Sequence, residues 1–582
     1  MVQILKKLRV LLDKKQKRTM TGLIFLMVIG AALQTAGVGI IVPVMSVIMD
    51  SDAIEHNALL HAAYEFAGGG SRQRFMLLIM GAMILVFIVK NLFLFLQQKL
   101  TLAFVYTNQF RTSERMMRNY LRRGYEFYLN ADTAVVQRSI TSDVNNMYAL
   151  ILALLQLASD GIVALFVVTF CFVQNGTMTI LIAVVLVLLL LVINRILKPI
   201  MHKAGEDNQN YYSSLFKWIS QTVQGIKEVK ITCKEQHFVS EYIKCGRGYV
   251  NAVQKYTLYN NVPRLLIETA CVAAMVGYMM YMVVSGMDTD HMLESITTFA
   301  AAALVLLPSV NRINNQINSI AYFEPFFMGV SDHLQDEITE QKVDMSYAVD
   351  DGKKLPVREK IVLQGITYAY PNTEKLIFDN AHMVIPIGKS VGIVGTSGAG
   401  KSTVVDILLG LLEARSGEIL ADGQNVKSHY RAWLKNVGYI PQMIFMLDDT
   451  IRKNVAFGVP EEEIDENRLW EALKEAQLDE FVKTLPEGLE TSIGERGIRL
   501  SGGQRQRIGI ARALYNDPEV LILDEATSAL DNDTEKAIME SIHRLHGRKT
   551  LIIIAHRLQT IAQCDLVYRV EKGKAIIERG TL

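Results

Sequence analysis

Six long apolar runs in the first 325 residues constrain the fold of this chain more than any other feature. A helix needs about 20 apolar residues to cross a bilayer, and six runs approach or exceed that length. The sequence therefore predicts a membrane domain of six transmembrane helices. The first run exceeds the 7–15 apolar residues of a signal-peptide core, so we expect no cleaved signal. The runs lie at about residues 21–49, 75–106, 146–173, 176–197, 262–285 and 295–325.

Basic residues flank the apolar runs unevenly, and this asymmetry predicts the orientation of the helices. Seven Lys and Arg residues lie between positions 6 and 18, and six Arg residues lie within 107–145. The first loop, about 50–72, is acidic. We therefore expect the N-terminus and the stretch 107–145 on the cytoplasmic side. Six crossings then return the C-terminal part to the cytoplasm.

The 582 residues are too many for one domain, and their composition changes along the chain. We predict a helical membrane domain over 1–330, a charged linker over 331–358 and a soluble α/β domain over 359–582. The formal net charge of +1 gives no reason to expect a nucleic-acid partner. The five cysteines show no C-x-x-C or metal-binding spacing, which indicates ordinary thiols.

A phosphate-binding loop opens the soluble domain. GTSGAGKS at 395–402 fits G-x-x-x-x-G-K-[ST], and it lies between an apolar strand, 390–395, and a helix, 402–412. Backbone N–H groups of such a loop cradle phosphates, and the helix start adds a positive dipole end. Lys401 is expected to reach the β- and γ-phosphates, and Ser402 to bind Mg²⁺. Asp524, at the end of the strand VLILD, is the second expected Mg²⁺ ligand.

A pentapeptide, LSGGQ at 500–504, lies between these two motifs. It resembles the signature of ATP-binding cassette (ABC) proteins, whereas an unrelated kinase-like phosphate-loop enzyme has no reason to carry it. The resemblance implies an ABC nucleotide-binding domain fused to an exporter-type membrane domain. GERG at 494–497 resembles an exporter motif, and SALD at 528–531 resembles the family's D-loop. A non-transport ABC protein would lack the apolar runs.

The same resemblance assigns roles to individual residues. Glu525 is implied as the base that polarises the attacking water, and His556, in IIIAHR, as the switch that contacts the γ-phosphate. Gln442, in YIPQ, is implied to sense Mg²⁺, and with Lys401 these residues form the expected catalytic set. Tyr370 is expected to stack on adenine, with Tyr368 as the competing candidate. The expected ATP-binding residues are Tyr370, Gly395, Thr396, Ser397, Gly398, Ala399, Gly400, Lys401, Ser402, Thr403, Gln442, Ser501, Gly502, Gly503 and Gln504.

The signature also implies a second ATPase domain, because in the family it caps the γ-phosphate bound by the opposite domain. This chain carries one such domain with every motif intact, so a homodimer is the simplest expectation. The long polar stretches 107–145 and 195–261 indicate helices that run on from the membrane. By resemblance they end in short coupling helices, which we expect near 126–134 and 209–217.

Charged residues inside the apolar runs point to the cargo. A charge within a membrane costs about 2.5–3.5 kcal/mol on insertion scales and usually faces a cavity. Lys90, Arg264 and Arg312 are three such bases. One acid, Glu268, lies a helical turn after Arg264 and could pair with it. The three bases predict a cavity for an anionic group. The alternative is that these bases, Arg264 and Arg312 above all, simply extend to the cytoplasmic interface.

Four segments resemble bacterial lipid-linked oligosaccharide flippases: 196–208, 226–231, 262–268 and 307–313. The resemblance implies a bacterial inner (plasma) membrane protein that moves a polyprenyl-pyrophosphate glycan to the outer leaflet. An amphipathic outer helix over 53–68 would fit this function. Near Val305 the chain is apolar where those flippases tend to be basic, which leaves the cargo less defined. The alternative is an exporter of drugs, other lipids or peptides.

Overall fold

A computed structural model of the protein describes residues 1–40, 44, 47, 61, 64–65, 72–174, 176–284, 289–339, 352–525, 532–554 and 561–581. His556, the segment 528–531 and most of the predicted outer helix 53–68 lie outside these residues. The chain forms two compact units. The first comprises Met1–Leu121 and Ala131–Gln341, and the second comprises Arg122–Asn130 and Lys342–Leu582.

The first unit is built from long helices. Among the described residues, four segments are long and apolar enough to cross a membrane: Lys14–Gly37, Gln73–Arg122, Thr133–Val173 and Ala183–Gln224. The fifth and sixth predicted runs fall in α12 and α13. The helices are α1 (Val2–Leu11), α2 (Lys14–Gly39), α6 (Arg72–Arg122), α8 (Thr133–Arg138), α9 (Val144–Gln174), α10 (Gly176–Gln224), α11 (Ile226–Ile231), α12 (Glu235–Val284) and α13 (Thr289–Thr339).

The expectation that the membrane helices continue as long polar extensions is confirmed, since α6, α10 and α12 each span about 50 residues. α13 also runs unbroken through the polar segment NRINNQIN. One predicted turn is in place, because the short helix α7 (Tyr125–Asn130) falls near 126–134. The second prediction is wrong: α10 continues through 209–217, and the turn comes at Gly225, before α11.

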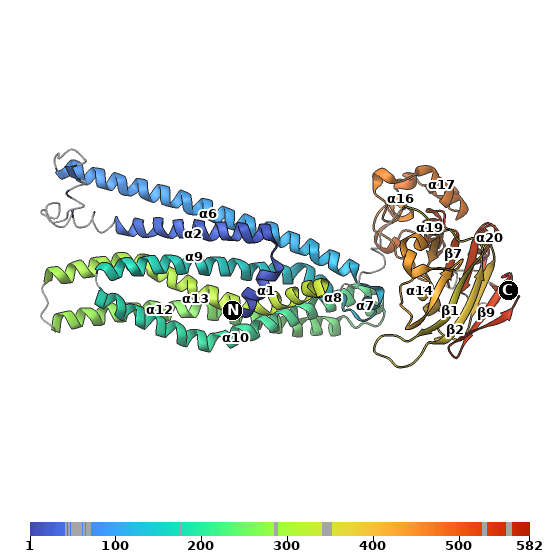
Figure 1. The fold of residues 1–582 in the computed structure, drawn as a ribbon, viewed down its shortest axis with the longest axis horizontal. Coiled ribbons are helices and arrows are strands. Elements are labelled where there is room, and N and C mark those ends of the chain that lie inside the picture. The colour runs from blue at the N-terminus through green and yellow to red at the C-terminus, as the bar shows by residue number, and fades with distance from the viewer. Residues whose placement is uncertain are drawn as a thin grey trace. The chain divides into compact units, whose positions relative to one another are not determined.

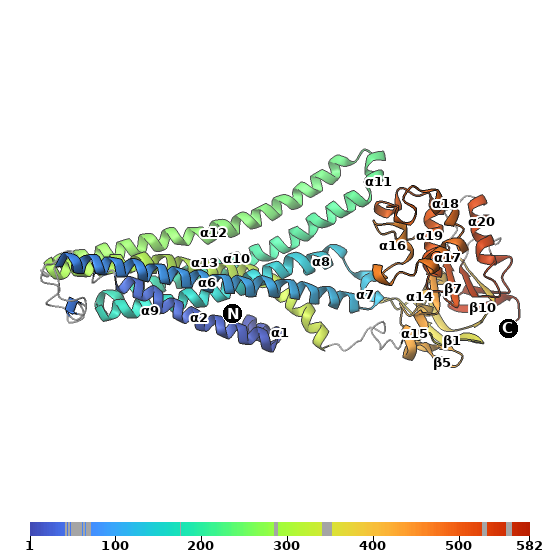
Figure 2. The ribbon, with the colours of Figure 1, turned by 90° about the horizontal axis from the view of Figure 1, so that it is seen from above.

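Close helix packing holds the first unit together. α9 packs on α13 and α2, and α10 packs on α12 and α13; Figure 2 shows α10 and α12 extending together towards α11. The tightest approach is at Gly205 in α10, where an added Cβ would lie 2.0 Å from the backbone oxygen of Tyr322 in α13. Any larger residue at this position would push the two helices apart.

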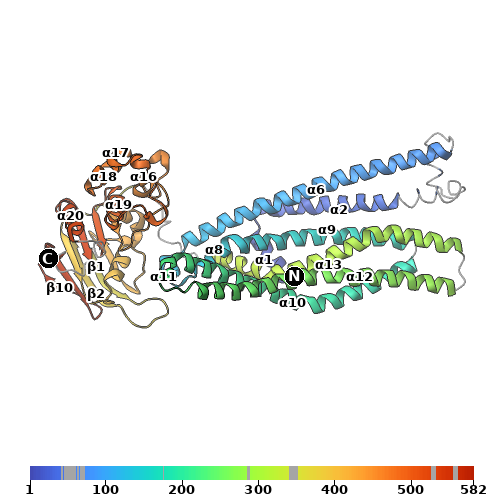
Figure 3. The ribbon, with the colours of Figure 1, turned by 180° about the vertical axis from the view of Figure 1, so that it is seen from behind.

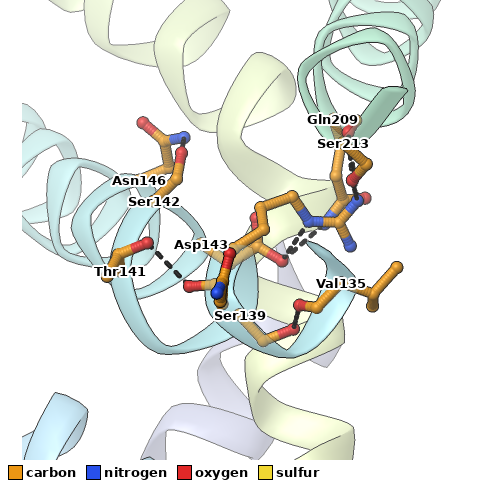
Figure 4. Close-up of polar contacts among 10 residues, drawn as sticks. Val135, Ser139, Thr141, Ser142, Asp143, Asn146, Gln209 and Ser213 are labelled. Carbon is orange, nitrogen blue, oxygen red and sulfur yellow. Dashed lines mark hydrogen bonds and ion pairs between the residues drawn. The ribbon is translucent and has the colours of Figure 1, made fainter. Parts of the chain in front are cut away.

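A buried polar network ties the start of α9 to α10 (Figure 4). Arg138 donates from Nε to Asp143 at 3.1 Å and from Nη1 to the carbonyl of Gln209 at 3.0 Å. Gln209 Nε2 donates to the same Asp143 oxygen at 3.1 Å. Asp143 ends a π-helical turn, Ser139–Asp143, and its side chain is 3% exposed. The pair therefore fixes how two polar extensions meet.

Replacing Arg138 with Ala is expected to destabilise the protein by about 3–5 kcal/mol, because it leaves the Asp143 carboxylate buried without its cationic partner. Thermal unfolding in detergent measures the effect as a lower melting temperature. Arg118→Ala is the matched control, since Arg118 pairs with Glu114 on an exposed surface. Such a surface pair contributes about 0–1 kcal/mol. Equal losses in the two variants would contradict the structural role of the buried pair.

The second unit contains two sheets. In the larger, the order is β10-β9-β3-β8-β7-β6, with β9, β3, β8, β7 and β6 parallel. The smaller, β2-β1-β4-β5, is antiparallel. The strands are β1 (Lys360–Tyr368), β2 (Phe378–Pro386), β3 (Ser390–Val394), β4 (Ser416–Ala421), β5 (Gln424–Asn425), β6 (Val437–Ile440), β7 (Val520–Asp524), β8 (Thr550–Ile554), β9 (Leu566–Glu571) and β10 (Lys574–Arg579).

Two hydrophobic cores support these sheets. The first lies between the large sheet and the helices α16 to α19, which are grouped at one end of the unit in Figures 1 and 3. The second lies between the two sheets, α14 and α15. The helices are α14 (Lys401–Leu408), α15 (Tyr430–Leu434), α16 (Ile451–Val455), α17 (Glu466–Glu475), α18 (Asp479–Thr484), α19 (Gly502–Leu514) and α20 (Asn532–His543).

Candidate functional site

The phosphate-loop motif forms the turn between the buried strand β3 and the helix α14, as its strand–loop–helix context predicts. Gly400 has φ +103°, and an added Cβ would lie 2.8 Å from Ile377 Cγ2. Gly395 is equally confined, because its Cβ would lie 2.6 Å from the carbonyl oxygen of Val570. Only glycine fits at these two positions, so packing against Ile377 and Val570 fixes the backbone of the loop.

Lys401 and Ser402 open α14 and lie at the base of the loop. Lys401 is 6% exposed, and its Nζ donates to the carbonyls of Gly395 at 3.2 Å and Thr396 at 3.3 Å. Ser402 Oγ donates to Asp524 Oδ1 at 3.3 Å. The loop lysine and the two expected Mg²⁺ ligands therefore meet at the carboxyl end of β7.

Two neighbouring acids concentrate negative charge at this end of the sheet. Asp524 is 7% exposed, and burial raises the pKa of its carboxyl. Burial and the neighbouring Asp524 raise the pKa of Asp406, on α14, to about 6. A divalent cation with oxygen ligands would relieve this repulsion. A serine hydroxyl beside a buried carboxylate is a donor set that suits Mg²⁺.

Glu525 follows Asp524 directly and leaves the strand in a left-handed conformation, with φ +50°. Its amide donates to the carbonyl of Ile554 at 3.0 Å, which holds the turn against β8. Gln442 comes two residues after β6, and its Nε2 donates to Glu525 Oε2 at 2.8 Å. The structure thus brings two of the predicted catalytic side chains into contact, next to the loop.

The two candidate tyrosines differ in exposure. Tyr368 is 1% exposed in the core, and its hydroxyl donates to Glu126 of α7 at 3.4 Å. Tyr370 is half-buried, and its hydroxyl lies 2.9 Å from Thr403 Oγ1 on α14. Their rings meet edge to face, with centroids 5.3 Å apart. Tyr370 therefore has the accessible ring beside the loop, and Tyr368 has the buried one.

The signature residues form the capped start of α19. Ser501 Oγ accepts from the amide of Gln504 at 3.2 Å, and Gln504 Oε1 accepts from the amide of Ser501 at 2.8 Å. Arg505 donates to the carbonyls of Gly497 and Leu500 and fixes the turn before the helix. Among the described residues, no hydrogen bond joins 501–504 to the phosphate loop. Ser501 and Gly502, at the start of the helix, are exposed.

A cavity of about 630 Å³ lies within the helical unit. Lys90 and Arg312, two of the three predicted bases, line it, but Arg264 is exposed on α12 and does not. Asp160, the most informative lining residue, was not predicted, although an acid inside the predicted apolar run 146–173 was a visible signal. The described lining residues are Met27, Gln34, Gly37, Phe87, Lys90, Leu94, Gln97, Gln98, Thr101, Leu102, Leu152, Gln156, Ser159, Asp160, Arg312 and Gln316.

Arg312 is anchored in the wall of this cavity. Its Nε donates to Asp160 Oδ1 at 2.8 Å, and its Nη2 donates to Ser309 Oγ at 3.3 Å. This ion pair with Asp160 holds the Arg312 side chain against α9 instead of leaving it free to extend. The geometry therefore favours the cavity interpretation for Arg312 over the interfacial alternative.

Comparisons with known proteins decide the family. A family described as "ABC transporter" matches residues 378–528, and "ABC transporter transmembrane region" matches residues 19–307. A protein of Syntrophus aciditrophicus (strain SB) named "ATP-dependent lipid A-core flippase" is 30% identical over 472 residues, covering 80% of this chain and 76% of that relative. The chain is an ABC exporter.

Further similarities fit this assignment. A protein of Cupriavidus pinatubonensis (strain JMP 134 / LMG 1197) with the same name is 28% identical over 476 residues, 80% of the exporter and 78% of that relative. The solved structure titled "Structure of a bacterial Atm1-family ABC exporter with ATP bound" superposes with a TM-score of 0.77 over 97% of the exporter and 95% of that chain, at 23% identity. The predicted fold class is confirmed. The family implies ATP binding and hydrolysis coupled to transport.

Proposed function

We propose that this exporter works as a homodimer that uses ATP hydrolysis to flip a lipid-linked oligosaccharide from the inner to the outer leaflet of a bacterial inner membrane. The observation that carries the cargo proposal is the cavity in which Lys90 and Arg312 meet amide and hydroxyl side chains. The N-terminus and the ATPase unit would lie in the cytoplasm, as the basic flanks predict. Residues 331–358 would connect the two domains.

In the proposed ATPase cycle, the loop amides and Lys401 bind the phosphates, and Tyr370 stacks on the adenine. Ser402, Asp524 and Gln442 would hold Mg²⁺, which neutralises phosphate charge when it is bound. Glu525 orients and polarises the attacking water, with its carboxylate positioned by Gln442. His556 is proposed to contact the γ-phosphate.

Two observations support the homodimer. The exposed signature residues Ser501 and Gly502 have, among the described residues, no hydrogen bond to the phosphate loop of the same chain, which fits a partner's ATP as their ligand. In addition, no residue of the most apolar stretch within Gln73–Arg122 is buried inside the chain. Its exposed residues include Leu77, Ile84, Leu85, Ile88 and Leu92. A second copy and lipid together would cover such a surface.

Two lines of support favour a lipid with an anionic glycan head. The relatives described above are named flippases of lipid A-core, a name that joins a lipid to a flipping activity. Lys90 and the donors of Arg312 suit phosphate oxygens, and five glutamines in the lining suit hydroxyl groups. A drug or peptide exporter is the alternative, and an aromatic or acidic cavity would have favoured it.

Flipping in proteoliposomes tests this proposal. Far-leaflet exposure of a polyprenyl-pyrophosphate oligosaccharide is measured with an added lectin, for the wild type and for Lys90→Ala/Arg312→Ala. We expect at least a tenfold slower exposure in the variant, because the headgroup loses its cationic contacts. ATP hydrolysis in the same vesicles reports on the ATPase unit.

Arg264→Ala is the matched control, since it removes one base outside the cavity lining and is expected to flip at nearly the wild-type rate. Equal flipping by the wild type and the double variant would contradict the anion-cavity proposal. The drug-or-peptide alternative would then be favoured.

A further inference from the structure

The charge balance of the cavity differs from the excess of bases that the sequence suggested. Three charged side chains occur among its described lining residues: Lys90 on α6, Asp160 on α9 and Arg312 on α13. Asp160 and Arg312 form an ion pair at 2.8 Å, so their charges cancel. Lys90 is left as the cation without an acidic partner among the described residues.

The surroundings of Lys90 keep its ammonium group in the cavity. Its Nζ lies 4.1 Å from the centre of the Phe87 ring, a cation–π contact that does not neutralise the charge. Its stem passes Gly37 of α2, where an added Cβ would lie 3.4 Å from Lys90 Cδ. The absence of a side chain at Gly37 therefore makes room for the lysine.

Asp160 controls Arg312 in two ways. Its side chain is 10% exposed and engages Nε, the inner nitrogen of the guanidinium, while Arg312 itself is 49% exposed. The hydrogen bond fixes the arginine against the cavity wall, and among the described residues no hydrogen bond is made by Nη1. The carboxylate also removes one unit of net charge, because an acid this close compensates the cation directly.

The other polar residues among the described lining are neutral, and most of them are amides. Gln34, Gln97, Gln98, Gln156 and Gln316 contribute, and Gln316 Nε2 donates to Gln156 Oε1 at 2.8 Å. A carboxamide donates and accepts without carrying charge, so it recognises hydroxyl groups. The described lining residues therefore combine one uncompensated cation with many neutral hydrogen-bonding groups.

We propose that Asp160 is a specificity-determining residue that limits the cavity to one net positive charge per protomer. The inference rests on the proposed homodimeric flippase, whose two protomers would supply two such cations. A headgroup with two negative charges, such as a pyrophosphate diester joined to a sugar, matches this balance. A headgroup with several phosphomonoesters does not, because each carries about −1.5 to −2 at neutral pH.

Binding of two probe lipids to the purified full-length protein tests the proposal. Native mass spectrometry in detergent compares cardiolipin, which has two phosphodiesters, with phosphatidylinositol 4,5-bisphosphate, which has two phosphomonoesters and one phosphodiester. We expect the wild type to favour cardiolipin. Asp160→Asn adds one positive charge per protomer, and we expect it to shift the binding ratio at least tenfold towards the bisphosphate.

Three further variants separate charge from folding. Asp160→Asn/Arg312→Gln keeps the wild-type net charge and should restore the wild-type ratio. Lys90→Gln makes the cavity neutral and should weaken both lipids relative to phosphatidylcholine. Asp207→Asn adds the same charge on the surface of α10, where Asp207 pairs with Lys203, and should leave the ratio unchanged.

The binding data distinguish a failure of the Asp160 inference from a failure of the flippase proposal. A binding ratio that does not follow the cavity charge across these variants overturns the role of Asp160 but leaves the flippase proposal intact. If neither anionic lipid binds the wild type better than phosphatidylcholine, the lipid-flipping proposal and this inference both fail. If Asp160→Asn does not fold, the double variant and Lys90→Gln still test whether lipid binding follows the cavity charge.

Discussion

Glu525→Gln is expected to lower ATP hydrolysis by roughly 10²–10⁴-fold, the range that a positioned general base contributes. The amide is nearly isosteric and still accepts a hydrogen bond from Gln442, so the fold of the site and ATP binding should persist. The attacking water loses only its polarising carboxylate. Hydrolysis is followed as phosphate release, and binding with a fluorescent ATP analogue. The variant should also accumulate as a closed dimer with ATP bound.

Glu519→Gln is the matched control for this experiment. Glu519 immediately precedes β7, so it lies at the opposite end of the strand from Glu525 and pairs at 3.7 Å with Lys354. Its replacement should leave turnover close to the wild-type value. Wild-type turnover in purified Glu525→Gln protein would refute the role proposed for this residue.

ATP-dependent crosslinking between two protomers is the second large effect that we expect. Ser397 of the phosphate loop and Ser501 of the signature are both exposed. If one protomer's loop and its partner's signature enclose the same ATP, cysteines at these two positions should crosslink across the seam. ATP without Mg²⁺ should convert most of the protein to a covalent dimer with a short thiol-reactive linker, and protein without nucleotide should stay monomeric in a denaturing gel.

The natural cysteines must be replaced first, because Cys233 is exposed and Cys245 and Cys271 are half-buried. Ser397→Cys alone and Ser501→Cys alone are the controls, and neither should give the ATP-dependent product. A fully active preparation that is demonstrably monomeric in nanodiscs would rule out the composite site. An intramolecular crosslink instead of a dimer would do the same.

The residues of the candidate ATPase site could be located in the sequence because most of them lie in contiguous motifs. GTSGAGKS specifies a tight turn in which packing forbids a side chain at Gly395 and Gly400, and the strand VLILD places Asp524 at the end of the sheet. Gln442 and Glu525 are 83 residues apart, and only the parallel pairing of β6 with β7 brings them together. The choice between Tyr368 and Tyr370 required burial, which two neighbouring aromatics do not reveal.

The membrane cavity was less predictable, since it depends on how helices rotate about their own axes. Asp160 and Arg312 are separated by 152 positions, and no local pattern sets their 2.8 Å contact. Arg264 illustrates the opposite error: a base in an apolar run can lie outside the cavity. The missed turn at Gly225 had a local signal, because glycine commonly ends a helix, whereas the polar segment 209–217 remains helical through packing on α12.

The chain passes between its two units three times: at residues 121/122, 130/131 and 341/342. The first two passages flank α7, which is held in the ATPase unit through Glu126 and Tyr368. Because the ends of α7 lead within a few residues into α6 and α8, movement of that unit would be delivered to two helices at once. Two short connections, one at each end of α7, resist compression as well as extension, which a single flexible linker cannot do.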